Sequence, residues 1–151
     1  MKFTERIIIN CSAVTAFDYT QDYSRRLSWD TFLKRADLMD GVTTAGIGVK
    51  AYCVAKNGLG MVTKYVTFNR PKQTAIKMTS GPWFFRSFLG SWNFKAITPA
   101  QTEVVFLYSF ALRFPLNLIS APVKRNLQAN VQQRLADLKK ALEAPSFEAL
   151  Q

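Results

Sequence analysis

Hydrophobic and polar residues alternate with a period of two along much of the chain, which predicts β-strands, and the period lengthens in three helical segments. The first strand is expected in the isoleucine-rich run from Phe3 to Cys11. Ser12 follows it and is suited to cap a short helix from Ala13 to Asp18. A second short helix is expected from about Tyr23 to Trp29, where Gly and Pro are absent and apolar positions lie four residues apart.

Turn residues divide the next part of the chain into strands. The segment from Phe32 to Met39 is predicted as a strand that ends at Asp40-Gly41. From Ile47 to Ala55 the odd positions are apolar, which indicates one buried face. Asn57-Gly58 follows, a pair typical of a type I′ turn, so Gly60 to Phe68 is expected to fold back as the partner strand of a hairpin.

Two long aromatic strands are predicted after a shorter one at Ala75 to Ser80. They share a turn at Thr98-Pro99-Ala100, and each places large side chains at alternate positions. The positions expected on the inner face are Phe88, Trp92 and Phe94 in the first strand and Val104, Phe106, Tyr108, Phe110, Leu112 and Phe114 in the second.

After Pro115 the period becomes that of an amphipathic helix, from about Leu116 to Ala144. Pro122 lies near its start, where a missing N–H costs least, so the regular helix is expected from about Ala121. The apolar positions that recur at spacings of three or four are Leu127, Val131, Leu135, Leu138 and Leu142.

This order of elements predicts an α+β fold, in which a curved antiparallel sheet of about seven strands surrounds a long C-terminal helix and two short helices follow the first strand. A length of 151 residues is typical of one domain, so residues 1–151 are assigned to a single domain. Bulky aromatic side chains on a curved sheet that meets only one helix either enclose an apolar cavity or fill the space as core, and both interpretations fit the pattern.

The chain carries 20 Lys and Arg residues against 10 Asp and Glu residues, a formal net charge of +10. Such an excess indicates either a solvated basic surface or a contact with an anionic membrane or nucleic acid. Basic residues are spread singly along the strands, with short pairs such as Lys124-Arg125 and Lys139-Lys140. The scattered pattern favours a solvated surface with no specific nucleic-acid partner, and a transient contact with an anionic membrane stays a hypothesis.

Neither an export signal nor a membrane-spanning segment is predicted. The longest mainly apolar run, Val104 to Leu112, is far shorter than the roughly 20 residues of a transmembrane helix. Charged residues within Met1 to Arg6 interrupt the place where a signal peptide needs an apolar stretch. We therefore expect a cytoplasmic protein in which Cys11 and Cys53 are free thiols.

The chain contains no histidine, which narrows the candidate chemistry. Catalytic Ser-His-Asp and Cys-His arrangements and histidine metal ligands are excluded, so we expect no metal and no cofactor. Asp30 is the candidate catalytic residue, because burial in a tunnel beside Trp29 would raise its pKa toward a value useful for proton transfer. The favoured alternative is that Asp30 caps or ends the second short helix.

Several segments together resemble one family. They are Ala16 to Tyr19 with Arg25 to Asp30, Gly46 to Val49, Asn57 to Met61, and Gly81 to Phe84 with Gly90, Ser91, Trp92 and Phe94. Over nearly the whole chain they are similar to the polyketide cyclase/dehydrase and lipid-transport branch of the START-like (SRPBCC, helix-grip) superfamily. The resemblance implies a hydrophobic tunnel under the C-terminal helix, which relatives use to carry lipids, sterols, hormones or aromatic polyketides, and in some cases to catalyse cyclisation or dehydration.

The leading hypothesis is a carrier or sensor that holds a hydrophobic small molecule between the sheet and the C-terminal helix. The alternatives are a cyclase or dehydratase that uses a cavity Asp or Tyr without a metal, and a basic surface that binds an anionic membrane or nucleic acid. The candidate ligand-binding residues are Trp29, Tyr52, Tyr65, Met78, Arg86, Phe88, Trp92, Phe106, Tyr108, Phe110, Leu127 and Val131. Arg86 shares the parity of Phe88, so it either meets an acidic ligand group at the cavity mouth or is solvated at a strand end.

Overall fold

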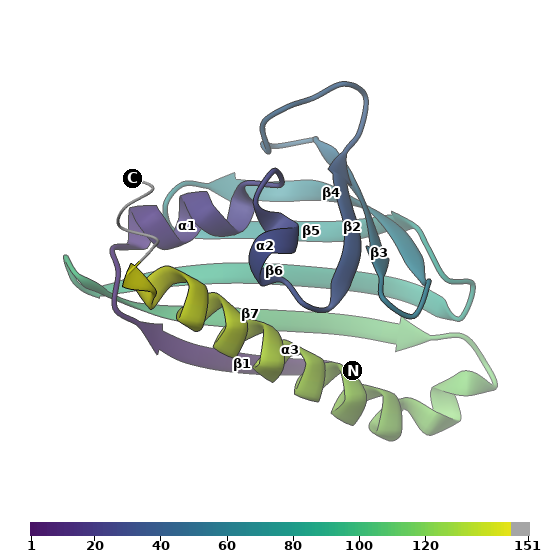
Figure 1. Cartoon of the computed structure of the whole chain (residues 1–151). Coiled ribbons are helices and arrows are strands. Elements are labelled where there is room, and N and C mark those ends of the chain that lie inside the picture. The colour runs from purple at the N-terminus through teal and green to yellow at the C-terminus, as the bar shows by residue number, and fades with distance from the viewer. Residues whose placement is uncertain (146–151) are drawn as a thin grey trace.

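The computed structural model describes residues 1–145 of the chain, so residues 146–151 of the predicted domain lie outside the described range. An antiparallel sheet of seven strands curves around a long C-terminal helix, α3 (Ser120–Glu143) (Figure 1). The order across the sheet is β1 (Lys2–Ile9), β7 (Gln101–Leu112), β6 (Phe85–Thr98), β5 (Gln73–Ser80), β4 (Gly60–Asn69), β3 (Lys50–Ala55) and β2 (Leu33–Leu38). The predicted α+β fold with a gripped helix is confirmed.

Two short helices follow β1 as predicted, with shifted ends. Helix α1 (Ala13–Gln21) begins after Ser12, whose hydroxyl accepts a hydrogen bond from the backbone N–H of Thr15 at 3.1 Å. It continues beyond the predicted end because Thr20 and Gln21 are buried. Helix α2 (Arg26–Trp29) begins later than predicted. Asp22 accepts hydrogen bonds from the backbone and the hydroxyl of Ser24, which holds the preceding residues in a turn.

The hairpin of β3 and β4 is confirmed, but its turn is not of type I′. Gly58 has a positive φ of 93° while Asn57 does not, and the N–H of Gly58 donates to the carbonyl of Ala55 at 2.9 Å. The geometry is that of a three-residue hairpin loop with a bulge at the glycine. Strand β3 also starts at Lys50 rather than at Ile47, because the φ of 77° at Gly48 lies outside the extended region.

The C-terminal end of β7 differs from the predicted inward row. Strand β7 ends at Leu112, and Phe114 is exposed rather than buried. The chain turns at Arg113, whose N–H donates to the carbonyl of Phe84 at 2.8 Å, and it continues into a 3₁₀ turn, η1 (Leu116–Ile119). The alternation of apolar residues in the sequence therefore continues past Leu112, the last residue of β7 that pairs with β6.

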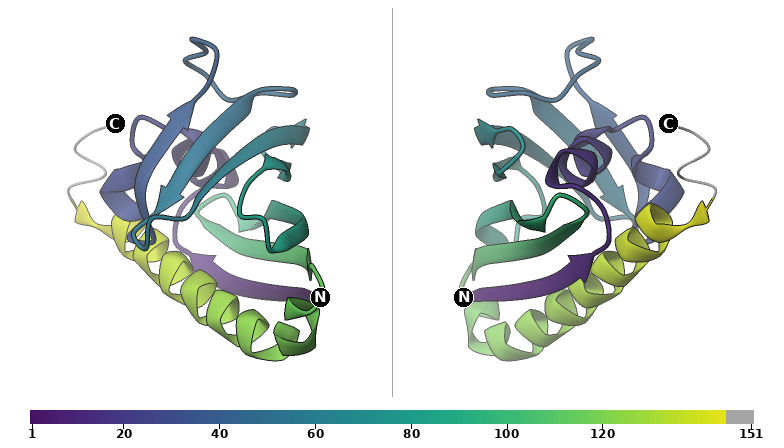
Figure 2. Two further views of the ribbon diagram at one scale, coloured as in Figure 1. Left: turned by 90° about the vertical axis from the view of Figure 1, so that its right-hand side faces the viewer. Right: turned by 90° about the vertical axis from the view of Figure 1, so that its left-hand side faces the viewer.

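Helix α3 begins at Ser120, next to the predicted Ala121, and runs along the open side of the curled sheet, while α1 lies inside the curl (Figure 2). The buried residues of α3 all lie from its middle onward, namely Val131, Arg134, Leu135, Leu138 and Leu142. The N-terminal half contributes half-buried residues such as Val123 and Leu127. No helix within the described residues is long and apolar enough to cross a membrane.

Candidate functional site

A cavity of about 460 Å³ lies between the concave face of the sheet and the N-terminal half of α3. Most of its wall is apolar. The sheet contributes Met61, Tyr65, Ile76, Phe88, Trp92, Phe106 and Tyr108, and α3 contributes Val123 and Leu127. These elements place the cavity where strands with alternating inward side chains meet the part of the helix before Val131, which has no buried residue.

A glycine helps to keep this space open. On β6 the cavity row reads Phe88, Gly90, Trp92, so the middle position of the row has no side chain. A β-carbon at Gly90 would lie 3.0 Å from Cε1 of Tyr108, which is closer than most real contacts of this kind. The missing side chain therefore leaves room both for the Tyr108 ring on β7 and for the cavity.

A buried charged cluster stands beside the cavity. Asp30 follows α2 as its C-terminal cap, and its Oδ2 accepts hydrogen bonds from Arg26 Nε at 2.8 Å and from Arg134 Nη2 at 2.9 Å. Its Oδ1 accepts a hydrogen bond from the backbone N–H of Phe32 at 3.2 Å. The favoured interpretation of Asp30 as a helix cap is confirmed, and both of its oxygens have protein partners.

The expectation that burial raises the pKa of Asp30 is wrong. Burial acts in that direction, but the positive charges of Arg134 and Arg26 outweigh it and lower the pKa to about 2. The partners explain the error, because Arg134 comes from α3, more than a hundred residues away in the sequence. At neutral pH the carboxyl group is therefore ionised and held in two ion pairs.

Arg134 connects this cluster to the aromatic wall. Its Nη1 donates to the hydroxyl of Tyr108 at 2.8 Å, and its guanidinium lies 5.2 Å from the ring centre of Phe32 and 5.7 Å from that of Phe106. Its Nε is buried without a hydrogen-bond partner. Arg134 and Arg26 both line the cavity. The charged cluster thus forms a polar end of an otherwise mainly apolar space.

A second buried polar group joins α1 to the sheet. The hydroxyl of Tyr65 donates to Oε1 of Gln21 at 2.6 Å and lies 3.4 Å from the hydroxyl of Tyr23. Burial raises the pKa of Tyr65 well above its ordinary value, so its hydroxyl stays protonated and acts as a donor. Cys53, on the predicted apolar face of its strand, is half-buried and lines the cavity, where burial raises the pKa of its thiol.

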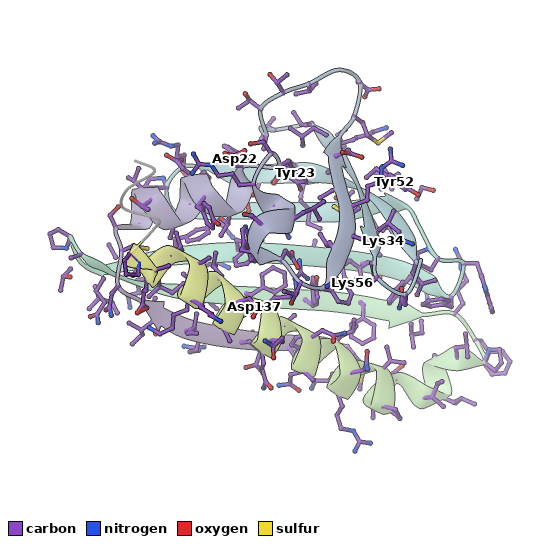
Figure 3. The ribbon with its side chains drawn as sticks, in the orientation of Figure 1. Asp22, Tyr23, Lys34, Tyr52, Lys56 and Asp137 are labelled. Atoms are coloured by element: carbon purple, nitrogen blue, oxygen red, sulfur yellow. The ribbon has the colours of Figure 1, made fainter. Side chains whose placement is uncertain are left out.

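The structure brings six of the predicted ligand-binding residues to the cavity wall: Tyr65, Phe88, Trp92, Phe106, Tyr108 and Leu127. Trp29, Phe110 and Val131 are buried in the adjacent core, and half-buried Met78 packs against that core. Tyr52 alternates with Cys53 and therefore points to the outer face of β3, where the guanidinium of Arg35 lies 5.1 Å from its ring centre (Figure 3). Arg86 is exposed and does not line the cavity, because a β-bulge between Phe85 and Ser87 shifts it out of the row.

The polar residues that α3 directs at the cavity were not predicted from the sequence. Asn126, Asn130 and Arg134 are four residues apart, so they share one face of the helix, and all three line the cavity. Tyr23 lies beside α1 in the loop that leads to α2 and also reaches the wall (Figure 3). A row of polar residues next to the apolar row of Leu127 and Val131 was a signal that the helix faces something other than a dry core.

Solved structures share this architecture at low sequence identity. A START superfamily protein from Mycobacterium smegmatis is 13% identical with a TM-score of 0.76, and each chain is covered to 99%. A protein from Thermus thermophilus is 15% identical with a TM-score of 0.79, with 95% of this chain and 100% of that chain covered. The Zhui aromatase/cyclase from a Streptomyces species is 14% identical with a TM-score of 0.71, with 95% and 96% covered. At these identities the likeness concerns the fold.

A search of the curated proteins finds no match. The family described as "Polyketide cyclase / dehydrase and lipid transport" matches residues 1–143, which is nearly the whole chain and includes the seven-stranded sheet, α1, α2, α3 and the cavity between them. The chain therefore belongs to the polyketide cyclase/dehydrase and lipid transport family.

Proposed function

We propose that this protein binds a hydrophobic small molecule in the cavity under α3 and acts as its carrier or sensor. The observation that supports the proposal is a space of about 460 Å³ whose wall is mainly aromatic and aliphatic. Cavities of roughly 300 to 1,000 Å³ with apolar walls and a few polar groups are typical of small-molecule sites. Membership of the family agrees with this role.

The proposal is tested with the neutral dye Nile red, whose fluorescence rises in an apolar site. Leu127→Trp places a larger side chain in the cavity and is expected to reduce dye binding at least about tenfold, since overfilling leaves no room for the ligand. Ile47→Trp, at an exposed loop position, is the matched control. Equal dye binding by both variants would place the dye elsewhere and contradict the proposal.

Asp30 gives no support to the alternative of a cyclase or dehydratase that uses a cavity aspartate. A general acid must be protonated near neutral pH, and a general base needs a pKa near the working pH. Asp30 has a pKa of about 2, and both of its oxygens are occupied by hydrogen bonds from protein groups. We therefore keep the carrier or sensor as the proposed function.

We also propose that the cavity is loaded at an anionic membrane surface. Three large apolar side chains at one end of the molecule are mostly exposed: Trp83 at 69%, Phe114 at 79% and Leu118 at 76%. We call Trp83, Phe114, Leu118 and half-exposed Ile119 the apolar tip. Its two segments are neighbours, because Nε of Arg113 donates to the carbonyl of Trp83 at 2.7 Å.

The apolar tip adjoins the cavity and lies in a basic part of the chain. Phe84 and Val123, close to its two segments in sequence, line the cavity. Between positions 41 and 136 the sequence contains twelve Lys and Arg residues and a single acidic residue, Glu103. Exposed aromatic side chains in a part of the chain with a large positive net charge suit the interface of an anionic bilayer.

The membrane proposal is tested by sedimentation with vesicles of phosphatidylglycerol and phosphatidylcholine in equal parts, against vesicles of phosphatidylcholine alone. Trp83→Ser with Phe114→Ser is expected to weaken binding to the anionic vesicles at least about tenfold, since two aromatic side chains no longer enter the bilayer. Ile47→Ser with Ile97→Ser, also at exposed positions, is the matched control. Equal binding by the two double variants, or binding to duplex DNA in preference to vesicles, would contradict this proposal.

A further inference from the structure

The charged cluster beside the cavity contains one more positive charge than negative charge. Arg26 and Arg134 are 7% and 6% exposed, and Asp30, their shared partner, is 1% exposed. Among the described residues that line the cavity there is no Asp or Glu. Two guanidinium groups and one carboxylate therefore leave an uncompensated positive charge in a largely apolar site. An unpaired buried charge costs free energy unless a counter-charge approaches it.

The hydrogen-bonding capacity of the two arginines is also not used up. Arg134 engages its Nη1 with Tyr108 and its Nη2 with Asp30, but its Nε has no partner. Arg26 engages Nε with Asp30 and Nη1 with the carbonyl of Thr20 at 3.4 Å. Since a guanidinium carries five N–H donors and Arg26 and Arg134 both line the cavity, donors remain for an acceptor in the cavity.

The rest of the wall combines a few neutral polar groups with a large apolar surface. Asn126 and Asn130 lead along α3 toward Arg134, and their side chains are joined by a hydrogen bond of 3.3 Å. The sheet side of the wall carries Phe88, Trp92 and Ile76, which offer no charge. A ligand that fits this wall has a polar group at one end and a hydrophobic remainder.

We propose that the natural ligand is a hydrophobic molecule that bears a carboxylate, which pairs with Arg134 and Arg26 while its apolar part lies against Phe88 and Trp92. This inference rests on the proposed function, since it assumes that the cavity holds the ligand. A carboxylate fits the planar donors of a guanidinium and supplies the missing negative charge. Because the site is buried, the low local dielectric strengthens the hydrogen bonds between this carboxylate and the two arginines.

The experiment compares pairs of displacers that differ only in the acid group: decanoate with decanol, and naphthoate with naphthylmethanol, each against bound Nile red. In the wild-type protein the acid of each pair is expected to displace the dye at a concentration roughly ten to a hundred times lower than the alcohol, as charge-assisted hydrogen bonds require. The two pairs separate the contribution of the acid from that of a linear or aromatic body. Equal potency of acid and alcohol would overturn this inference and leave the proposed function standing.

Arg134→Gln supplies the second arm. It removes the surplus charge and leaves Arg26 and Asp30 as a matched pair, so Nile red should still bind while the preference for the acid disappears. Arg125→Gln, on the exposed side of the same helix, is the control and should keep the preference. A preference that survives Arg134→Gln would overturn the inference.

If neither Nile red nor any displacer binds the wild-type protein, the proposed function fails and this inference fails with it. If circular dichroism shows that Arg134→Gln does not fold, the ratio for the wild-type protein decides.

Discussion

The two halves of α3 cover the same sheet, yet one half is packed and the other is not. In the C-terminal half Leu138 and Leu142 are buried and belong to the same hydrophobic core as Phe17 of α1. In the N-terminal half Leu127 and Val123 are only half-buried, and they face the cavity. One amphipathic pattern therefore serves two purposes along a single helix.

The difference comes from what the rest of the chain places inside the curl of the sheet. At the packed end α1 inserts Phe17, whose ring contacts Phe68 and Phe94 in edge-on arrangements with centroids 5.3 and 5.5 Å apart. At the open end no helix of the described residues 1–145 fills the curl (Figure 2), and the row of β6 is interrupted by Gly90. The charged cluster lies between them, because Arg134 precedes the packed Leu135 and follows the cavity residue Asn130. The boundary between core and cavity is therefore built of ion pairs.

Removing the negative charge at this boundary is expected to have the largest effect. Asp30→Asn would leave Arg26 and Arg134 without a counter-charge, and breaking a buried ion pair costs about 3 to 5 kcal/mol of the free energy of unfolding. Urea unfolding measures the loss. The matched control is Asp37→Asn, whose partner Arg35 is exposed, and it should leave the unfolding curve unchanged. Equal free energies of unfolding for the two variants would mean that the charged cluster does not stabilise the boundary between core and cavity.

The same truncation in the two halves of α3 tests the contrast directly. Leu138→Ala creates a hole in close-packed core and is expected to lower the free energy of unfolding by about 2 to 5 kcal/mol. Leu127→Ala only enlarges a cavity that exists already, so less than about 1 kcal/mol is expected. Thermal unfolding of the two variants provides the measurement, and similar losses would show that the open half is packed in solution.

Acid should weaken the boundary before it affects the packed core. The pKa of Asp30 is lowered from the ordinary value of 3.8 to about 2, so its ion pairs contribute fully above pH 3.8 and are lost as the pH falls through about 2. A difference of this size corresponds to about 2 kcal/mol. Urea unfolding from pH 5 to pH 2 should show this decline in the wild-type protein and in Asp37→Asn. Stability independent of pH over that range would contradict the ion-pair assignment.

The fold was predicted well from the hydrophobic periodicity, because burial of one face of a strand or helix requires apolar residues at regular positions. Phe106, Tyr108 and Phe110 alternate in the sequence and are buried on one face of β7, whereas Phe114 keeps the alternation and is exposed because the pairing with β6 ends at Leu112. Local patterns report which face a side chain prefers, but the end of a strand is set by its neighbour in the sheet.

The site was predicted less completely because its chemistry depends on contacts between distant residues. The aromatic wall followed from strand parity, and six of the expected residues line it. The charge state of Asp30 depends on Arg134, which α3 brings to it from the other end of the chain. Only the fold joins these two residues, so the sequence around Asp30 indicated the opposite direction for its pKa.

The smallest expected effect concerns the hydrogen bond that ties α1 to the wall of the cavity. Tyr65→Phe keeps the ring that lines the cavity and removes the hydroxyl that donates to Gln21, so about 1 kcal/mol of the free energy of unfolding should be lost while Nile red binding is unchanged. Tyr52→Phe, on the outer face of β3, is the matched control and should change neither property. Loss of dye binding by Tyr65→Phe at nearly full stability would contradict this expectation. The dye would then depend on the Tyr65 hydroxyl rather than on the ring, and polar contacts would matter more for binding than the mainly apolar wall indicates.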